Sequence, residues 1–239
     1  MRLNLLYLCL ITFSYASGQF LPVPQVSGAP FSADEIQLEN PSPNVRNVLP
    51  MKTIAVYRDS AGRTRVDVSV PRDPTGNPNL VIDDPVANVV YMIDETNKFV
   101  RRLTFPSPRP VPLASERPKN SPALGLMFPR SQSVQTATES LGNQLIQGIS
   151  TEGKRVTSIS PQTPPGCEKN VSIIESWYSQ ELWLTLLQKH SNCLGEGSTH
   201  LENIRRAEPD PRLFQIPKDY VVVEQEWNKP PAKPPLVSR

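Results

Sequence analysis

Few side chains in this chain can do acid–base, nucleophilic or metal chemistry near neutral pH. Among its 239 residues there are two histidines, His190 and His200, and three cysteines. Histidine is the usual general base at neutral pH, but both lie in segments with strand or turn patterns. No nucleophile elbow, phosphate-binding glycine loop or H-E-x-x-H helix accompanies them. The sequence therefore predicts a protein that is not an enzyme and that needs no cofactor.

The cysteines favour a cross-link. One of the three lies in an N-terminal segment expected to be removed, which leaves Cys167 and Cys193. A hairpin that turns near residues 179–181 brings these two together at its open end, and an even number in an exported chain favours a disulfide, worth about 3 kcal/mol for a loop of this length. The competing interpretation is a metal site with His190 and His200, but the spacing fits no usual zinc pattern. The sequence predicts a disulfide and no metal.

The N-terminus has the organisation of a secretory signal peptide. Arg2 precedes an apolar run over residues 3–13, and small residues follow up to Gly18. No later segment approaches the roughly 20 apolar residues of a membrane-spanning helix. We expect residues 1–18 to be removed and the protein to be secreted or periplasmic. With 25 basic and 23 acidic residues, the charge is nearly balanced, so a nucleic-acid partner is not expected.

The segments that must position any site have the alternating pattern of β-strands. Val66, Val68 and Val70 alternate with polar residues, as in a strand with one buried face. Residues 182–190 contain helix formers and could be a short amphipathic helix, but their alternation favours a strand. The predicted fold class is mainly β: a curved, half-barrel-like antiparallel sheet of about eight to ten strands with a long Pro-rich disordered insertion. The strands are expected at residues 53–58, 66–70, 79–82, 88–94, 98–105, 141–147, 154–160, 171–178, 182–190 and 198–205.

Proline marks the boundaries between segments. The chain has 27 prolines, unevenly placed. Proline-rich polar segments cannot supply ladder donors or a core, so they are expected to be extended or disordered. We expect an extended Pro-rich arm at 19–50, a single β domain at 51–225 with a flexible insertion at 106–137, and a disordered tail at 226–239.

Cations gather near the insertion. Arg101, Arg102, Arg109 and Arg117 have few acidic neighbours. They predict a weak contact with an anionic surface, and the alternative is a loop kept soluble by its charge.

The order of several segments resembles known proteins. YRDSAGRTRVD, IDDPVANVVYMIDETNKFVRRL, TESLGNQLIQGISTEGKRVTSI, IIESWYSQELWLTLL and EPDPRLFQIPKDY follow one another as in uncharacterised exported bacterial proteins. They are more distantly similar to periplasmic lipoprotein-carrier-like half-barrel proteins. The resemblance implies a curved sheet whose concave face holds an acyl chain or a partner. Those carriers cover this face with amphipathic helices, and no helix pattern of that kind is found in this sequence.

Two functions stay open at this point. The first is a non-catalytic envelope module that binds a lipid or other hydrophobic ligand, and the second is a structural or protein-interaction module that engages an envelope protein without a small ligand. The candidate ligand-binding residues could equally form the sheet core. These candidates are Leu145, Ile174, Trp177, Trp183 and Leu186.

Overall fold

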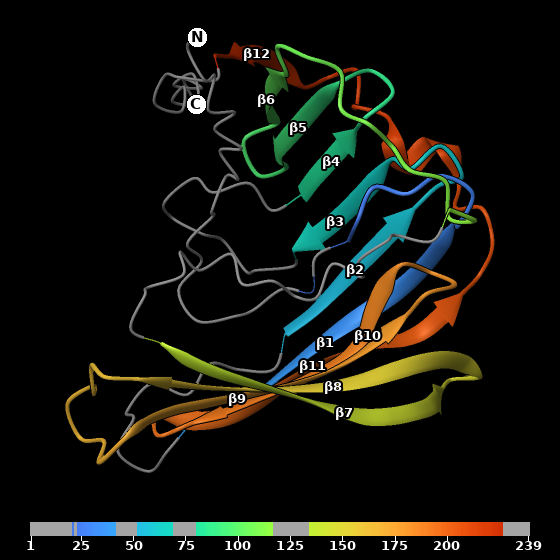
Figure 1. The fold of residues 1–239 in the computed structure, drawn as a ribbon. Coiled ribbons are helices and arrows are strands. Elements are labelled where there is room, and N and C mark those ends of the chain that lie inside the picture. Colours follow the sequence, from blue (N-terminus) through green and yellow to red (C-terminus); the bar gives the residue numbers. More distant parts are fainter. Residues whose placement is uncertain (1–20, 22, 42–51, 69–79, 117–133, 227–239) are drawn as a thin grey trace, which may run out of the picture.

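The computed structural model describes residues 21, 23–41, 52–68, 80–116 and 134–226 (Figure 1). These residues form twelve strands and one short 3-10 helix, η1. In chain order, β1 to β12 are Phe31–Pro41, Lys52–Arg58, Thr64–Val68, Leu80–Asp84, Val89–Asp94, Phe99–Thr104, Gln135–Ile146, Ile149–Ser160, Asn170–Ser179, Leu184–Asn192, Gly195–Arg205 and Val221–Gln225, with η1 at Pro211–Phe214 between β11 and β12.

All twelve strands belong to one curved sheet. Its order is β12-β6-β5-β4-β3-β2-β1-β11-β10-β9-β8-β7, and neighbours are antiparallel except for the parallel pair of β12 and β6. We refer to β2–β6 as the N-terminal wing and to β7–β11 as the C-terminal wing. Figure 1 shows the two wings at an angle to each other, with β1 between them. The predicted mainly β, curved antiparallel fold is confirmed.

Turn chemistry explains where the hairpins of the N-terminal wing reverse. The side chain of Asp59 accepts a hydrogen bond from the backbone N–H of Arg63 at 2.8 Å, and Asp84 and Asp94 accept in the same way from the N–H groups of their turns. Gly62 has a φ of +86°, and an added Cβ would lie 2.8 Å from Val111. The turn therefore needs glycine for conformation and for space.

The main core joins the two wings. It contains apolar side chains from β1, β2, β8, β10 and β11, so the sheet curves far enough to bring β8 near β1. The amide of Gln147, in the β7–β8 turn, donates to the carbonyl of Leu201 on β11 at 2.8 Å and holds this curvature. The buried core residues are Leu21, Phe31, Ala33, Ile54, Val56, Ile149, Leu182, Leu184, Leu186 and Leu201.

One acidic side chain lies inside this apolar region. Glu35 on β1 is 1% exposed, and its Cα partners are Ile54 and Leu201. Its carboxyl accepts hydrogen bonds from Gln37 at 2.8 Å and from the backbone N–H of Leu21 at 3.3 Å. Burial raises the pKa of Glu35 to about 7, because the desolvation cost of the charged form exceeds the help of these two donors.

Irregular segments cover both faces of the N-terminal wing. On one face, residues 23–30 pair through Ser27 with Pro112 and Ala114. They are fixed by the buried guanidinium of Arg58, which donates to the carbonyls of Pro24 and Ala29. On the other face, Phe214 of η1 packs into a cluster with side chains of β4, β5 and β6. This wing therefore packs on both sides.

One segment differs from the expectations. Residues 31–41, expected in an arm, form β1 in the middle of the sheet. The buried face of β1 includes Glu35 and Gln37, so its polar sequence did not indicate a central strand. The favoured interpretation of residues 182–190 as a strand is confirmed: β10 follows a turn and pairs with both β9 and β11. The predicted signal peptide at 1–18 and most of the insertion and the tail lie outside the described residues.

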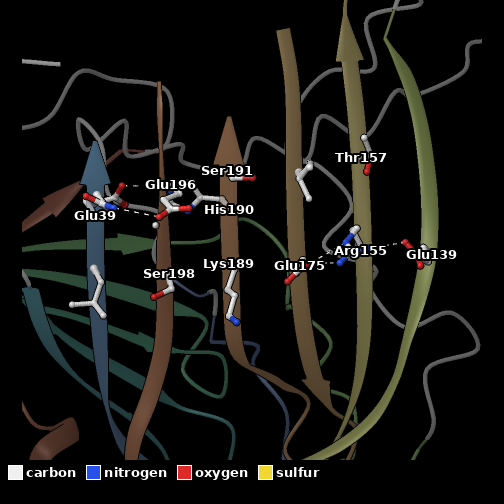
Figure 2. Close-up of a pocket in the computed structure, with 14 residues that line it drawn as sticks. Glu39, Glu139, Arg155, Thr157, Glu175, Lys189, His190, Ser191, Glu196 and Ser198 are labelled. Carbon is white, nitrogen blue, oxygen red and sulfur yellow. Dashed lines mark hydrogen bonds and ion pairs between the residues drawn. The ribbon is translucent and has the colours of Figure 1, made fainter. Parts of the chain in front are cut away.

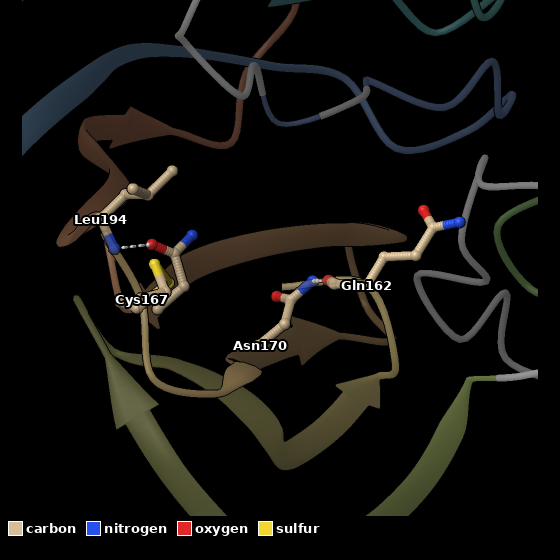
Figure 3. The surroundings of a disulfide bond; sticks show 6 residues. Gln162, Cys167, Asn170 and Leu194 are labelled. Carbon is tan, nitrogen blue, oxygen red and sulfur yellow. Dashed lines mark hydrogen bonds between the residues drawn. A yellow bond between two sulfur atoms is a disulfide. The ribbon is translucent and has the colours of Figure 1, made fainter. Parts of the chain in front are cut away.

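A disulfide joins Cys167 to Cys193, the pairing expected from the sequence (Figure 3). Their Cα atoms are 5.7 Å apart. The bond ties the connection between β8 and β9 to the turn between β10 and β11. Within the same region, the Asn170 amide donates to the carbonyl of Gln162, and the N–H of Leu194 donates to the Asn192 side chain. The strand ends of the C-terminal wing are thus held together.

In the described part of the chain, there is no helix with the length and apolar character needed to cross a membrane.

Candidate binding groove

A groove of about 730 Å³ crosses β1 and the C-terminal wing (Figure 2). Its walls are two rows of side chains that run across neighbouring strands at the end held by the disulfide. In the first row, each residue is the Cα partner of the next: Glu139, Arg155, Glu175, Lys189, Ser198 and Leu38. The second row, two positions along each strand and hence on the same face, contains Thr157, Ile173, Ser191, Glu196 and Asn40.

Arg155 is neutralised inside the first row. Its guanidinium lies 2.9 Å from the carboxylate of Glu139 and 2.7 Å from that of Glu175, one on each neighbouring strand. The hydrogen bonds that it donates to Glu175 and Glu139 raise the pKa of Arg155. The arginine therefore connects β7, β8 and β9, and the carboxylates of Glu139 and Glu175 share its guanidinium as their ion-pair partner.

Lys189 is placed differently. Its Nζ lies 5.5 Å from the centre of the Trp177 ring, and among the described residues it makes no ion pair. Glu175, its partner across the ladder, is held by Arg155. Trp177 is 9% exposed and lies against Gly153, where an added Cβ would be 2.8 Å from the indole nitrogen. Lys189 therefore presents an ammonium group without an ion-pair partner over the face of an aromatic ring.

His190 is paired with a carboxylate. Its Nε2 lies 3.4 Å from Glu39 across Gly197, where an added Cβ would be 2.6 Å from the imidazole. Glycine at this position thus allows the two side chains to meet. In the part of the chain that the structure describes, no hydroxyl is hydrogen-bonded to His190, and no group of three potential metal ligands is found. The groove can hold charged and polar groups by contact.

The sequence-predicted ligand residues do not come together. Leu145 on β7 is 73% exposed, Leu186 is fully buried in the core, and Trp183 lies in the β9–β10 turn, where its indole donates to the carbonyl of Ala114 at 3.0 Å. Ile174 lies between two groove residues of β9 and so points to the opposite face. Only Trp177 borders the groove, through Lys189. Residues chosen for apolar character alone fall on different faces and ends of the sheet.

The charged groove residues were not found from the sequence. Counting outward from the β7–β8 turn, a regular hairpin would place Arg155 opposite Ser140 rather than Glu139. A register shift between Ser140 and Gly142 moves the pairing by one residue and brings the charges opposite each other. The opposite charges of Glu139, Arg155 and Glu175 could have indicated the cluster from the sequence. The β-bulge changes the register, however, so a regular hairpin does not predict that these residues are opposite each other.

Three of the arginines proposed to contact an anionic surface are engaged within the fold. Arg109 lies 2.7 Å from Asp83, Arg102 lies 3.0 Å from Glu224, and Arg101 is largely buried beside Phe99. Arg117 lies outside the described residues.

No protein-family model and no curated protein matches the chain. Comparison with solved structures finds the resemblance indicated by the sequence. At 11% identity, the chain is similar to lipoprotein LppX from Mycobacterium tuberculosis, over 74% of this chain and 88% of that one with a TM-score of 0.33. It is also similar, at 11% identity, to a LolA superfamily protein from Nitrosomonas europaea, over 80% and 91% with a TM-score of 0.29. A third similar structure, also at 11% identity, is a putative outer membrane lipoprotein-sorting protein domain from Vibrio parahaemolyticus. The similarity covers 78% of this chain and 89% of that one with a TM-score of 0.32.

Proposed function

We propose that the protein is an exported, non-catalytic binding module of the cell envelope that holds an amphipathic ligand in the groove. The observation that carries this proposal is the groove itself, which no described segment covers, whereas both faces of the N-terminal wing are packed. A concave, half-buried surface with a few convergent polar groups is the usual form of a small-ligand site.

The surroundings of the groove suit a ligand with a polar and an apolar part. Ile173 lies in the second row, and the next row on the same face contains the pair of Ile159 and Val171. Ile159 is 47% exposed. On the other side, Trp177 and Leu187 are Cα partners. The charged first row thus has apolar side chains on both sides, and burying them under a hydrocarbon chain would favour binding.

The chemistry of the groove supports binding rather than catalysis. The guanidinium of Arg155 is held between the carboxylates of Glu139 and Glu175, and His190 is turned to Glu39. An export location is supported by the N-terminal signal pattern and by the disulfide, since structural disulfides persist in oxidising compartments. We also propose that all twelve strands, β1 included, form a single β domain.

The test is the composition of the protein purified from its producing cells without detergent. Organic extraction and mass spectrometry should recover an amphiphile. Ser198→Trp, which places a large ring between Lys189 and Leu38 in the first row, should lower the amount of bound amphiphile. Thr138→Trp is the matched control, because Thr138 is exposed on β7 and alternates with the groove residue Glu139. Protein that carries no amphiphile and binds none when it is supplied would overturn the proposal.

A second candidate function, protein interaction in the envelope, is favoured by β7. This strand of 12 residues ends the sheet, and its side chains are exposed along nearly its whole length. Edge strands of this kind can add a strand from another chain. A photo-crosslinker at Leu145 should capture one defined envelope protein in intact cells if this function holds, and no specific product if it does not. A contact of Arg117 and its neighbours with anionic surfaces stays a prediction, to be checked by salt-sensitive vesicle binding.

A further inference from the structure

We propose that the groove selects a zwitterionic head group, with the anion on Lys189 and Ser198 and the cation on Glu196. This inference rests on the proposed function and names the ligand class. It follows from which charged side chains of the groove already have an ion-pair partner in the fold and which do not.

The first step is the charge balance. Glu139 and Glu175 share the single cation Arg155, so these three residues together keep one net negative charge. Of the charged groups in the two rows, Lys189 and Glu196 then stay without an ion-pair partner among the described residues. A ligand that neutralises both must carry one charge of each sign.

The second step is the anion position. Lys189 is held over Trp177, so its ammonium lies on the side of the groove next to the indole. Its Cα partner on β11 is Ser198, whose hydroxyl can donate a second hydrogen bond. An ammonium and a hydroxyl on adjacent strands suit a phosphate or carboxylate group.

The third step is the cation position. Glu196 lies in the second row, as Cα partner of Ser191 on β10 and Asn40 on β1. The Asn40 amide donates to its carboxylate at 3.2 Å. Glu196 and Lys189 are diagonal neighbours across β10 and β11, but their contacts hold them in opposite directions. A zwitterion can therefore bridge two charges that do not neutralise each other.

The same arrangement disfavours ligands of single charge. A purely anionic head group would be attracted by Lys189 but repelled by the nearby carboxylate of Glu196. A purely cationic head group would be attracted by Glu196 but repelled by the ammonium of Lys189. Ile173, in register with Ser191 and Thr157, offers an apolar contact beside the head group. Phosphocholine and phosphoethanolamine groups have this chemistry, either on a lipid or free in solution.

The experiment measures binding of three amphiphiles with the same dodecyl chain to the full mature protein by calorimetry. They are dodecylphosphocholine, dodecyl phosphate and dodecyltrimethylammonium, all kept below micelle formation, with free phosphocholine as a fourth arm. Dodecylphosphocholine should bind about tenfold more tightly than the two singly charged amphiphiles, the effect of one charge-assisted hydrogen bond.

Variants locate the effect. Lys189→Gln and Glu196→Gln should each weaken dodecylphosphocholine binding about tenfold, and Lys189→Arg should restore most of it. The matched controls are Lys98→Gln and Glu224→Gln, because these residues form exposed ion pairs at the β12 edge of the sheet. The controls should leave the affinity unchanged, and circular dichroism should show the same fold in every variant.

The outcomes separate the two proposals. Equal binding of all three amphiphiles, unchanged by Lys189→Gln and Glu196→Gln, overturns the zwitterion inference and leaves the amphiphile-binding function intact. No binding of any dodecyl amphiphile overturns the proposed function. Free phosphocholine that binds as tightly as dodecylphosphocholine supports the head-group site and overturns the role of the apolar chain.

Discussion

The two wings of the sheet are built from the same kind of hairpin but are packed differently. The strands of the N-terminal wing have 5 to 7 residues, and β5 is buried at nearly every position. The strands of the C-terminal wing have 9 to 12 residues, and β7 has no buried residue. A strand buried on both sides needs apolar residues at successive positions, whereas a strand with one wet face does not.

This difference assigns separate roles to the wings. The N-terminal wing is packed on both faces, against residues 23–30 on one side and η1 on the other. The C-terminal wing packs one end into the shared core and leaves a charged face at the other. Under the proposed function, the first wing is the support and the second carries the proposed binding surface, and four changes test the distinction.

The largest effect is expected where the wings share one core. Phe31→Ala on β1 should lower the free energy of unfolding by about 4 kcal/mol, because it removes a fully buried ring between them. Urea denaturation monitored by circular dichroism measures this loss. Val86→Ala, at a residue 71% exposed, should change stability by less than about 0.5 kcal/mol. If Phe31→Ala unfolds only one wing, the wings do not share a cooperative core.

Loss of the disulfide should lower global stability and, in addition, loosen the C-terminal wing. Changing Cys167 and Cys193 together to serine should cost about 3 kcal/mol, because the connection they close regains its freedom in the unfolded chain. Native-state hydrogen exchange should rise most in the β8–β9 connection and the β10–β11 turn, where the bond lies, and less in β4–β6. An equal rise of exchange at the same amides of both wings would contradict a local role of the bond.

The joint between the wings should depend on pH through Glu35. Because its pKa is raised to about 7 in the fold, the folded protein binds a proton that the unfolded chain has released between about pH 4.5 and pH 7. Stability should therefore fall as the pH rises through this window, by about 3 kcal/mol in total. Urea denaturation of Glu35→Gln at pH 5 and pH 8 should show a smaller difference in the free energy of unfolding between the two pH values than the original protein shows. An equal difference would mean that other titrating groups cause the pH dependence.

The smallest stability effect is expected at Arg155. Its side chain is partly exposed, so Arg155→Gln should change the stability little. The same change frees Glu139 and Glu175, which should weaken binding of dodecyl phosphate more than that of dodecyltrimethylammonium. Calorimetry with the two amphiphiles measures this shift, and an unchanged ratio of affinities would exclude Arg155 from setting the charge of the groove.

The sequence predicted the N-terminal wing better than the functional face. A hairpin needs alternating side chains and turn residues wherever it packs. Val66 and its neighbours supply this alternation, and the carboxylates of Asp84 and Asp94 supply the turns, so both could be predicted locally. The strand β1 was missed because Glu35 and Gln37 occupy buried positions, which only the folded surroundings reveal. Its polar sequence is typical of a linker.

The groove depends on register across six strands, which local patterns do not determine. The shift between Ser140 and Gly142 brings Glu139 to Arg155, and another between Thr185 and Leu187 changes the pairing of β10 with β9. Trp177 was chosen for its aromatic ring, and its contact with Lys189 depends on that second shift. The disulfide pairing was accessible because a hairpin turn fixes which ends meet.

The place of β1 also bears on the order in which the molecule is assembled. Asn40 and Glu196, which touch across β1 and β11, are 156 residues apart. The central ladder can therefore close only after almost the entire polypeptide has been synthesised, while the local hairpins on either side can form earlier. Pairing between residues so far apart in the sequence slows folding. Until β1 pairs, the edges of β2 and β11 are without a partner strand and can pair with other chains.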